Sequence, residues 1–108
     1  SFLKWELKQA GVLSMQADNT EDAIELLKEV EFEAIFLDIV LGQSNSSEIV
    51  DYIRSSSNAV NPGLKVILMS GLIDKEFMKK HNQKFYKILE KPFVDKDVQD
   101  IIETLKAV

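Results

Sequence analysis

The chain contains no cysteine, which excludes disulfides, thiol nucleophiles and cysteine-ligated zinc sites. Its single histidine, His81, has no second imidazole with which to form a nitrogen metal site and is expected on a helix surface. The four glycines are scattered, and neither a dinucleotide-binding fingerprint nor a Walker loop occurs. Nucleotide-binding folds that depend on those loops are therefore not indicated. The lack of cysteine also suits the cytosol.

Positive charge and long apolar runs are also scarce. Lys and Arg number 13 against 18 Asp and Glu, which gives a net charge of -5. Because binding to nucleic acid needs a face rich in Lys and Arg, we expect no direct nucleic-acid contact. No apolar run approaches the roughly 20 residues that span a bilayer, so we expect a cytoplasmic protein without a membrane segment. With 45% apolar residues, the chain can bury one core and is predicted to form a single domain over residues 1–108.

Helical and strand-like patterns alternate along the chain. Apolar residues recur at intervals of three and four in the predicted helices, and short apolar runs mark the predicted strands. Gly11 ends the first helix, and the second helix follows the cap residues Asp18 to Thr20. Residues 42–47 are predicted to form a loop and residues 61–63 a turn. The predicted helices cover residues 2–10, 20–30, 48–53, 74–81 and 98–108, and the predicted strands cover residues 12–17, 34–39, 65–70 and 86–90.

This alternation predicts an α/β fold, in which a doubly wound parallel sheet carries helices on both faces. Such a domain normally opens with a strand, whereas these residues open with a helix. We therefore expect the first strand of the sheet to be missing from this sequence. Since a missing central strand leaves two unpaired edges, strands 12–17 and 34–39 are expected to pair directly or to be bridged by another molecule, as in a dimer.

Polar residues mark the ends of three of the predicted strands. Asp38 lies at the end of the strand at 34–39, Ser70 ends the strand at 65–70, and Lys91 follows the strand at 86–90. The carboxyl ends of parallel strands meet at one edge of an open α/β sheet. We therefore expect a carboxylate nucleophile, a hydroxyl donor and a cation to converge on one crevice.

On these residues the chain resembles the receiver domain of two-component response regulators. The resemblance runs nearly end to end, with Asp38 after an apolar strand, Ser70-Gly71 after the next, and Lys91-Pro92-Phe93 after the last. It implies a flavodoxin-like sheet and a signalling domain that is not an enzyme beyond its own phosphorylation and dephosphorylation. The implied partners are a histidine kinase or phosphotransfer protein and a downstream effector protein.

The resemblance also implies roles for particular residues. Asp38 would accept the phosphoryl group, Ser70 would be the switch hydroxyl, and Lys91 would bind the phosphate. The family's Mg²⁺ would be held by Asp38 and by the backbone carbonyl of Val40. An Asp carboxylate is ionised at neutral pH and needs no general base, so the site must mainly neutralise the phosphoryl oxygens and hold the reacting atoms in line.

Several positions depart from the family pattern. The acidic pair at the end of the family's first strand is absent, so Asp38 and Val40 give Mg²⁺ too few anionic ligands. Asp18 belongs to a different predicted strand and cannot replace that pair. Ser46 stands where a glycine is common, and Ile88 stands where an aromatic residue often reports activation. We therefore expect poor Mg²⁺ binding and slow phosphorylation of these residues alone.

The sequence is compatible with two other functions. A phosphatase of the haloacid dehalogenase kind would need a second aspartate two residues after the first, where Val40 stands instead. A receiver-like interaction module that is not phosphorylated would keep the same surfaces without the chemistry. Taken singly, Asp38 could be a backbone cap and Lys91 a solvated charge, and only their combination favours the phosphoacceptor.

Overall fold

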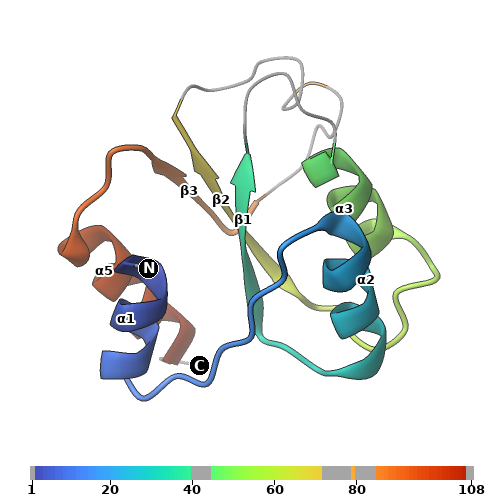
Figure 1. The fold of residues 1–108 in the computed structure, drawn as a ribbon, viewed down its shortest axis with the longest axis horizontal. Helices are drawn as coiled ribbons and strands as arrows, with labels where there is room; N and C mark the ends of the chain where they lie inside the picture. Colours follow the sequence, from blue (N-terminus) through green and yellow to red (C-terminus); the bar gives the residue numbers. More distant parts are fainter. Residues whose placement is uncertain (1, 40–44, 72–78, 80–84, 107–108) are drawn as a thin grey trace. The chain divides into compact units, whose positions relative to one another are not determined.

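The computed structural model describes residues 2–39, 45–71, 79 and 85–106, drawn in colour in Figure 1. They fall into two compact units, one made of residues 1–16 and 92–108 and the other of residues 17–91. Among the described helices, none combines the length and the apolar character that crossing a membrane requires.

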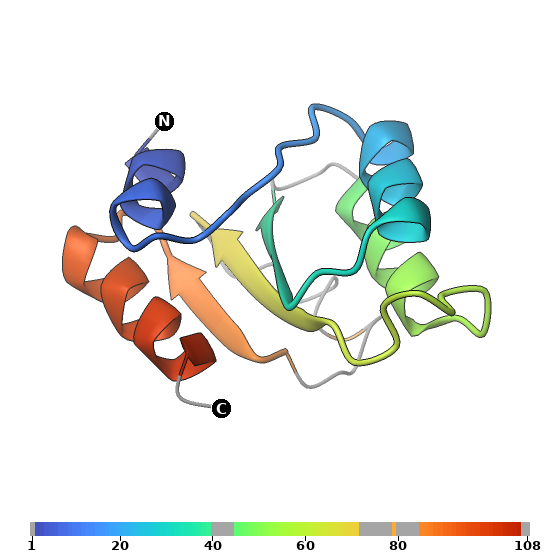
Figure 2. The ribbon, with the colours of Figure 1, turned by 90° about the horizontal axis from the view of Figure 1, so that it is seen from below.

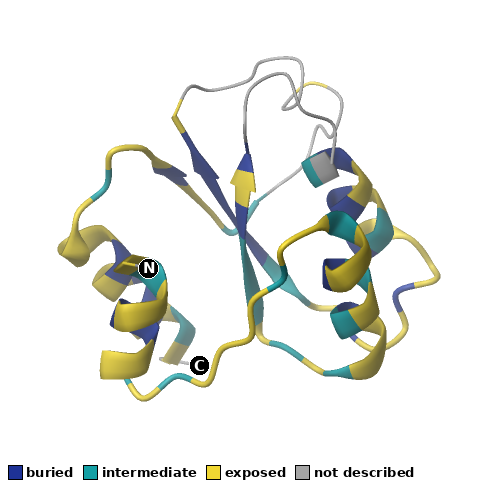
Figure 3. Cartoon of the chain, viewed as in Figure 1, coloured by how far each residue is buried: buried dark blue, intermediate teal, exposed yellow. Residues whose placement is uncertain are grey.

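The unit of residues 17–91 is built on a parallel sheet with the strand order β1-β2-β3. β1 is Ala34–Ile39, β2 is Lys65–Ser70 and β3 is Lys87–Glu90. Five of the six residues of β2 are buried, as expected for a central strand that is paired at both edges (Figure 3). The predicted α/β class with a parallel sheet is confirmed.

Two helices of this unit, α2 (Thr20–Glu29) and α3 (Asn45–Arg54), form its core together with β1 and β2. Figure 2 shows the two helices side by side. Side chains two residues apart on a strand share a face, so alternate residues of β1 and β2 meet the helices. The core residues are Ala23 and Leu27 of α2, Leu37 and Ile39 of β1, Ile49, Val50 and Ile53 of α3, and Val66 and Leu68 of β2.

α2 begins as the sequence predicts. The side chain of Asn19 accepts a hydrogen bond from the backbone N–H of Asp22 at 2.8 Å, which satisfies one of the free donors of the first turn. A second asparagine, Asn61, binds the other end of this helix. The buried Asn61 side chain donates to the carbonyls of Leu27 and Val30, both at 2.8 Å, and so caps the last turn of α2.

Asn61 also organises the turn before β2. Its side-chain oxygen accepts from the backbone N–H of Phe32 at 2.6 Å. Its own N–H donates to the side chain of Asn58, which donates in turn to the carbonyls of Ile53 and Asn61, both at 2.7 Å. Every polar atom of the two buried side chains is therefore bonded, and the pair fixes the chain between α3 and β2 against the end of α2.

The second unit contains α1 (Phe2–Gln9) and α5 (Asp95–Lys106). The buried residues of α5 are Val98, Ile101 and Ile102, three members of the apolar stripe that the sequence shows. Gln99 of α5 donates to the carboxylate of Glu6 in α1 at 3.3 Å. The turn after α1 contains Gly11, whose φ of 74° is the left-handed conformation that glycine adopts without strain.

Two predictions about the elements are wrong. Residues 12–17 are not a strand, and the side chain of Leu13 is 99% exposed. A strand forms only with a partner, and none of the described residues pairs with this segment. Residues 45–47, assigned to a loop, are the first turn of α3. Residues 42–44, together with all of the predicted helix at 74–81 except Lys79, lie outside the described residues.

Replacing Asn61 by alanine should destabilise the protein far more than the same change at Asn19. Asn61→Ala removes one buried and two part-buried hydrogen bonds, and we expect a loss of about 3 kcal/mol in the free energy of unfolding. Asn19→Ala removes one exposed cap and should cost about 1 kcal/mol. Urea unfolding of both variants measures the difference, and equal losses would contradict the role assigned to Asn61.

Candidate functional site

The candidate site lies at the carboxyl edge of the three-stranded sheet, within the unit of residues 17–91. Asp38 is the fifth residue of β1 and lies opposite Met69 of β2. Its neighbours Leu37 and Ile39 are buried in the core with α2 and α3, so strand alternation places Asp38 on the other face. About half of its side chain is exposed, which leaves the carboxylate accessible from solvent.

Lys91 meets this carboxylate. Its Nζ lies 2.6 Å from Oδ1 of Asp38, although the two residues are 53 positions apart in the sequence. The backbone N–H of Lys91 donates to the carbonyl of Ser70 at 2.7 Å, so the lysine is anchored at the end of β2. The predicted convergence of carboxylate and ammonium is present in the structure.

The ion pair contributes little to stability. Its side chains are 51% and 40% exposed, for Asp38 and Lys91 respectively, and solvent-exposed pairs are typically worth less than about 1 kcal/mol. The geometry instead supplies a negatively charged nucleophile with a cation beside it. That combination suits chemistry on an anionic group, whose charge the ammonium can partly neutralise.

Ser70 lies on the central strand of the sheet, between β1 and β3. It is the last residue of β2, it is buried, and it pairs in register with Ile39 on one side and Glu90 on the other. The residue before it, Met69, is the one opposite Asp38. Ser70 therefore belongs to the same edge of the sheet as the ion pair. Val40, the proposed carbonyl ligand, lies outside the described residues.

Ser46 is a site residue whose contact the sequence did not reveal. Its hydroxyl donates to the backbone carbonyl of Asp38 at 3.0 Å and ties the first turn of α3 to the end of β1. In the sequence, Ser46 stood out only as a departure from a common glycine. The sequence signal for this contact was a hydroxyl side chain in the first turn of a helix that follows a strand.

The described residues do not fit a divalent metal site. Among them, no three His, Cys, Asp or Glu side chains lie close enough together to hold a metal ion. The Asp38 carboxylate is in addition engaged by an ammonium group, which a cation would have to displace. Mg²⁺ usually needs one or two carboxylates besides its waters and other oxygen ligands, and Asp38 supplies one whose charge the Lys91 ammonium already offsets.

Comparison with known proteins gives the family. The model of the response regulator receiver domain matches residues 1–103, almost the whole chain. This chain belongs to the response regulator receiver domain family. A search of curated proteins gave no match.

Solved receiver domains share the fold of this receiver. A CheY-like receiver domain protein from Methanospirillum hungatei JF-1 is 20% identical, with a TM-score of 0.76 over 97% of this chain and 82% of that one. A response regulator from Thermotoga maritima is also 20% identical, with a TM-score of 0.77 over 99% and 87%. The receiver domain of the sensor histidine kinase PA1611 from Pseudomonas aeruginosa PAO1, which has a magnesium ion in its active-site cleft, is 16% identical, with a TM-score of 0.78 over 98% and 86%.

Membership of the family settles the general role of the chain. Receiver domains are phosphoacceptor signalling domains of two-component systems rather than classical enzymes, and they work with histidine kinases and effector proteins. The doubly wound, flavodoxin-like fold expected from the resemblance is confirmed by the structural neighbours.

We expect this 108-residue chain to bind Mg²⁺ weakly, with a dissociation constant above about 1 mM, since the Asp38 carboxylate is paired with Lys91 and the described residues contain no cluster of three or more His, Cys, Asp or Glu side chains. Amide NMR shifts of Asp38, Ser70 and Lys91 during an Mg²⁺ titration would measure it. Lys91→Met should tighten binding by freeing the carboxylate, whereas Lys87→Met, on the exposed part of β3, should not. Saturation at submillimolar Mg²⁺ would contradict the prediction.

Proposed function

We propose that this receiver domain accepts a phosphoryl group on the carboxylate of Asp38, from the phosphohistidine of a histidine kinase or phosphotransfer protein. The observation that supports this proposal is the 2.6 Å contact between Asp38 Oδ1 and Lys91 Nζ. This contact places a cation beside an accessible nucleophile, and phosphoryl transfer needs such a cation to offset the charge of the phosphoryl oxygens.

The transfer follows from the chemistry of these groups. A carboxylate oxygen of Asp38 attacks phosphorus and forms the new O–P bond, while the N–P bond of the phosphohistidine breaks and its electron pair stays on the imidazole. The obstacle is repulsion between an anionic nucleophile and an anionic phosphoryl group. The Lys91 ammonium lies where it can neutralise the phosphoryl oxygens as the two approach. The exposed half of the Asp38 side chain leaves room for the donor.

Phosphorylation would also rearrange the resting site. In the free domain Lys91 is held by the Asp38 carboxylate, and an acyl phosphate on Asp38 moves the negative charge outward to the phosphoryl oxygens. Lys91 would follow that charge. Ser70, buried at the end of the central strand, is proposed as the hydroxyl that donates to a phosphoryl oxygen and changes the surface that an effector protein binds.

A second candidate is a receiver-like interaction module that is not phosphorylated. The observation that favours it is that the described residues contain no cluster of three or more His, Cys, Asp or Glu side chains around Asp38, because phosphoryl transfer in this family relies on Mg²⁺. Such a module would keep the fold and its protein-binding surfaces, and the Asp38 carboxylate would stay paired with the Lys91 ammonium.

Treatment with acetyl phosphate and Mg²⁺ should add one phosphoryl group to the protein, read by intact mass, and Asp38→Asn should abolish the adduct. An amide has no ionised oxygen with which to attack phosphorus. Asp18→Asn, at an exposed aspartate outside the site, is the control and should be labelled like the parent protein. An unlabelled parent protein would support the interaction module instead, and an adduct that survives Asp38→Asn would place the acceptor elsewhere.

Replacing the ammonium by an uncharged group tests the role of Lys91. Lys91→Met should slow formation of the adduct by at least about tenfold, because the charge that offsets the phosphoryl oxygens is lost. The free energy of unfolding should change by less than about 1 kcal/mol, since the pair is half exposed. Lys87→Met on β3 is the matched control and should change neither quantity. An unchanged rate in Lys91→Met would remove Lys91 from the mechanism.

A further inference from the structure

The backbone carbonyl of Asp38 faces the edge of β1 that β2 leaves open. The carbonyl of Glu33, just before β1, accepts a hydrogen bond from the backbone N–H of Lys65 at 3.1 Å. In a parallel ladder every second residue of a strand bonds to the same neighbour, so the residues in step with Glu33, up to Ile39, turn their backbone groups to β2. Asp38 is out of step with Glu33, and its backbone groups point to the opposite edge. None of the described strands pairs with that edge.

Ser46 supplies a hydrogen bond to this carbonyl. A backbone carbonyl at a strand edge needs a donor from another strand, a side chain or water. The Ser46 hydroxyl donates to the carbonyl oxygen of Asp38 at 3.0 Å. At the end of β1 this side chain therefore does what the backbone N–H of a neighbouring strand does within a sheet, and alanine or glycine at the same position could not.

The helix that carries Ser46 is fixed by the core. Ser46 lies in the first turn of α3, and the buried residues Ile49, Val50 and Ile53 of that helix pack with α2, β1 and β2. A helix held in this way cannot shift without disturbing close packing. The hydroxyl of Ser46 is therefore a fixed point to which the end of β1 is tied.

The position of the Asp38 carboxylate depends on this backbone. Two torsion angles separate the carboxylate from Cα, so a change in backbone direction moves it directly. Its partner Lys91 is anchored separately, because the N–H of Lys91 donates to the carbonyl of Ser70 at 2.7 Å. Phosphoryl transfer needs the attacking oxygen in line with the bond that breaks, and a displacement of about 1 Å can slow a reaction by up to about 100-fold. A hydrogen bond to the backbone of Asp38 can therefore control the rate without touching the phosphoryl donor.

We propose that Ser46 is a positioning residue for phosphoryl transfer onto Asp38. Its hydroxyl holds the carbonyl of Asp38 and so keeps the carboxylate beside Lys91 and open to the donor, while Ser46 itself makes and breaks no covalent bond. The inference rests on the proposed phosphoacceptor role of Asp38 and adds a residue on which the rate of that reaction depends.

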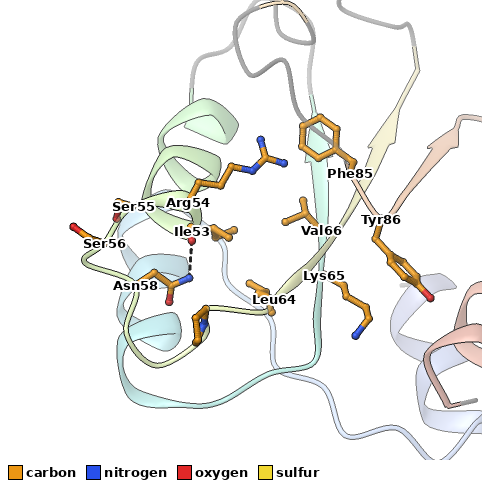
Figure 4. Close-up of a pocket in the computed structure, with 11 residues that line it drawn as sticks. Ile53, Arg54, Ser55, Ser56, Asn58, Leu64, Lys65, Val66, Phe85 and Tyr86 are labelled. Carbon is orange, nitrogen blue, oxygen red and sulfur yellow. Dashed lines mark hydrogen bonds between the residues drawn. The ribbon is translucent and has the colours of Figure 1, made fainter. Parts of the chain in front are cut away.

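The chain offers a matched control at the other end of α3. Ser55 follows the last residue of α3, and its hydroxyl donates to the carbonyl of Tyr52 at 2.7 Å. Figure 4 shows Ser55 next to Arg54, at a pocket beside the start of β2. At a rise of about 1.5 Å per residue, roughly 13 Å of helix separates it from Ser46. Ser55→Ala therefore removes the same kind of hydrogen bond from the same helix without affecting Asp38.

Acetyl phosphate and Mg²⁺ should phosphorylate Ser46→Ala about fivefold more slowly than the parent protein, as followed by intact mass over time. The loss should appear in the limiting rate and not in the acetyl phosphate concentration that gives half of it, because Ser46 does not bind the donor. Ser46→Thr, which keeps the hydroxyl, should restore the parent rate to within about twofold, and Ser55→Ala should react like the parent. Ser46→Ala and Ser55→Ala should lower the urea midpoint by similar amounts, so lost stability cannot explain a difference in rate.

NMR of the unphosphorylated domain gives a second readout. Ser46→Ala should shift the carboxyl ¹³Cγ resonance of Asp38 and the ¹⁵Nζ resonance of Lys91, and Ser55→Ala should shift neither. An unchanged rate in Ser46→Ala, equal slowing in Ser55→Ala, or a loss that Ser46→Thr does not restore would overturn the positioning role and leave the phosphoacceptor role standing.

A parent protein that takes up no phosphoryl group would instead remove the phosphoacceptor role, and the resonances then decide the role of Ser46 separately. Shifts of Asp38 and Lys91 confined to Ser46→Ala would support it, and unchanged resonances in that variant would overturn it.

Discussion

The register of the parallel ladder between β1, β2 and β3 is the constraint on which the candidate site depends. Backbone hydrogen bonds fix Asp38 opposite Met69, and Ser70 opposite both Ile39 and Glu90, so the three strands end at one edge. Lys91 follows β3 immediately, and its N–H is held by the carbonyl of Ser70. A shift of one residue in either pairing would turn side chains to the opposite face and separate the ammonium from the carboxylate. The buried side chains of β2 hold that register, because any shift would move apolar groups out of the core.

The two ends of β2 carry different chemistry on the same rigid support. At the carboxyl end, an accessible carboxylate is paired with one ammonium, and among the described residues no acidic cluster stands beside it. At the amino end, two cations lie over aromatic rings in a pocket without described carboxylates. The sheet thus carries a carboxylate paired with an ammonium at its carboxyl edge, and two cations near the start of β2. Both groups of side chains are placed by the same core of α2, α3, β1 and β2.

Much of this could be predicted from residue patterns. The bounds of β1 and β2 match the prediction because continuous apolar runs suit strands with both faces covered. The turn at Gly11 follows α1 and Asn19 caps α2, since these ends are decided by local backbone chemistry. The strand predicted at 12–17 is wrong because a strand depends on a partner. The hydrogen bonds of Asn61 to Leu27 and Phe32 could not be predicted, because these residues are distant from Asn61 in the sequence. An asparagine in a turn is just as common where its side chain only faces solvent.

Most of the helices and strands, and the three polar residues at the strand ends, follow from the residues alone, because periodicity and turn chemistry are local properties of each segment. Family membership also follows from it, since the receiver domain model matches residues 1–103. The folded chain alone brings Asp38 against Lys91, Ser46 of α3 against the end of β1, and Arg54 against the ring of Phe85. Contacts of that kind join residues far apart in the chain, and they exist only once core packing and strand register have placed the backbone.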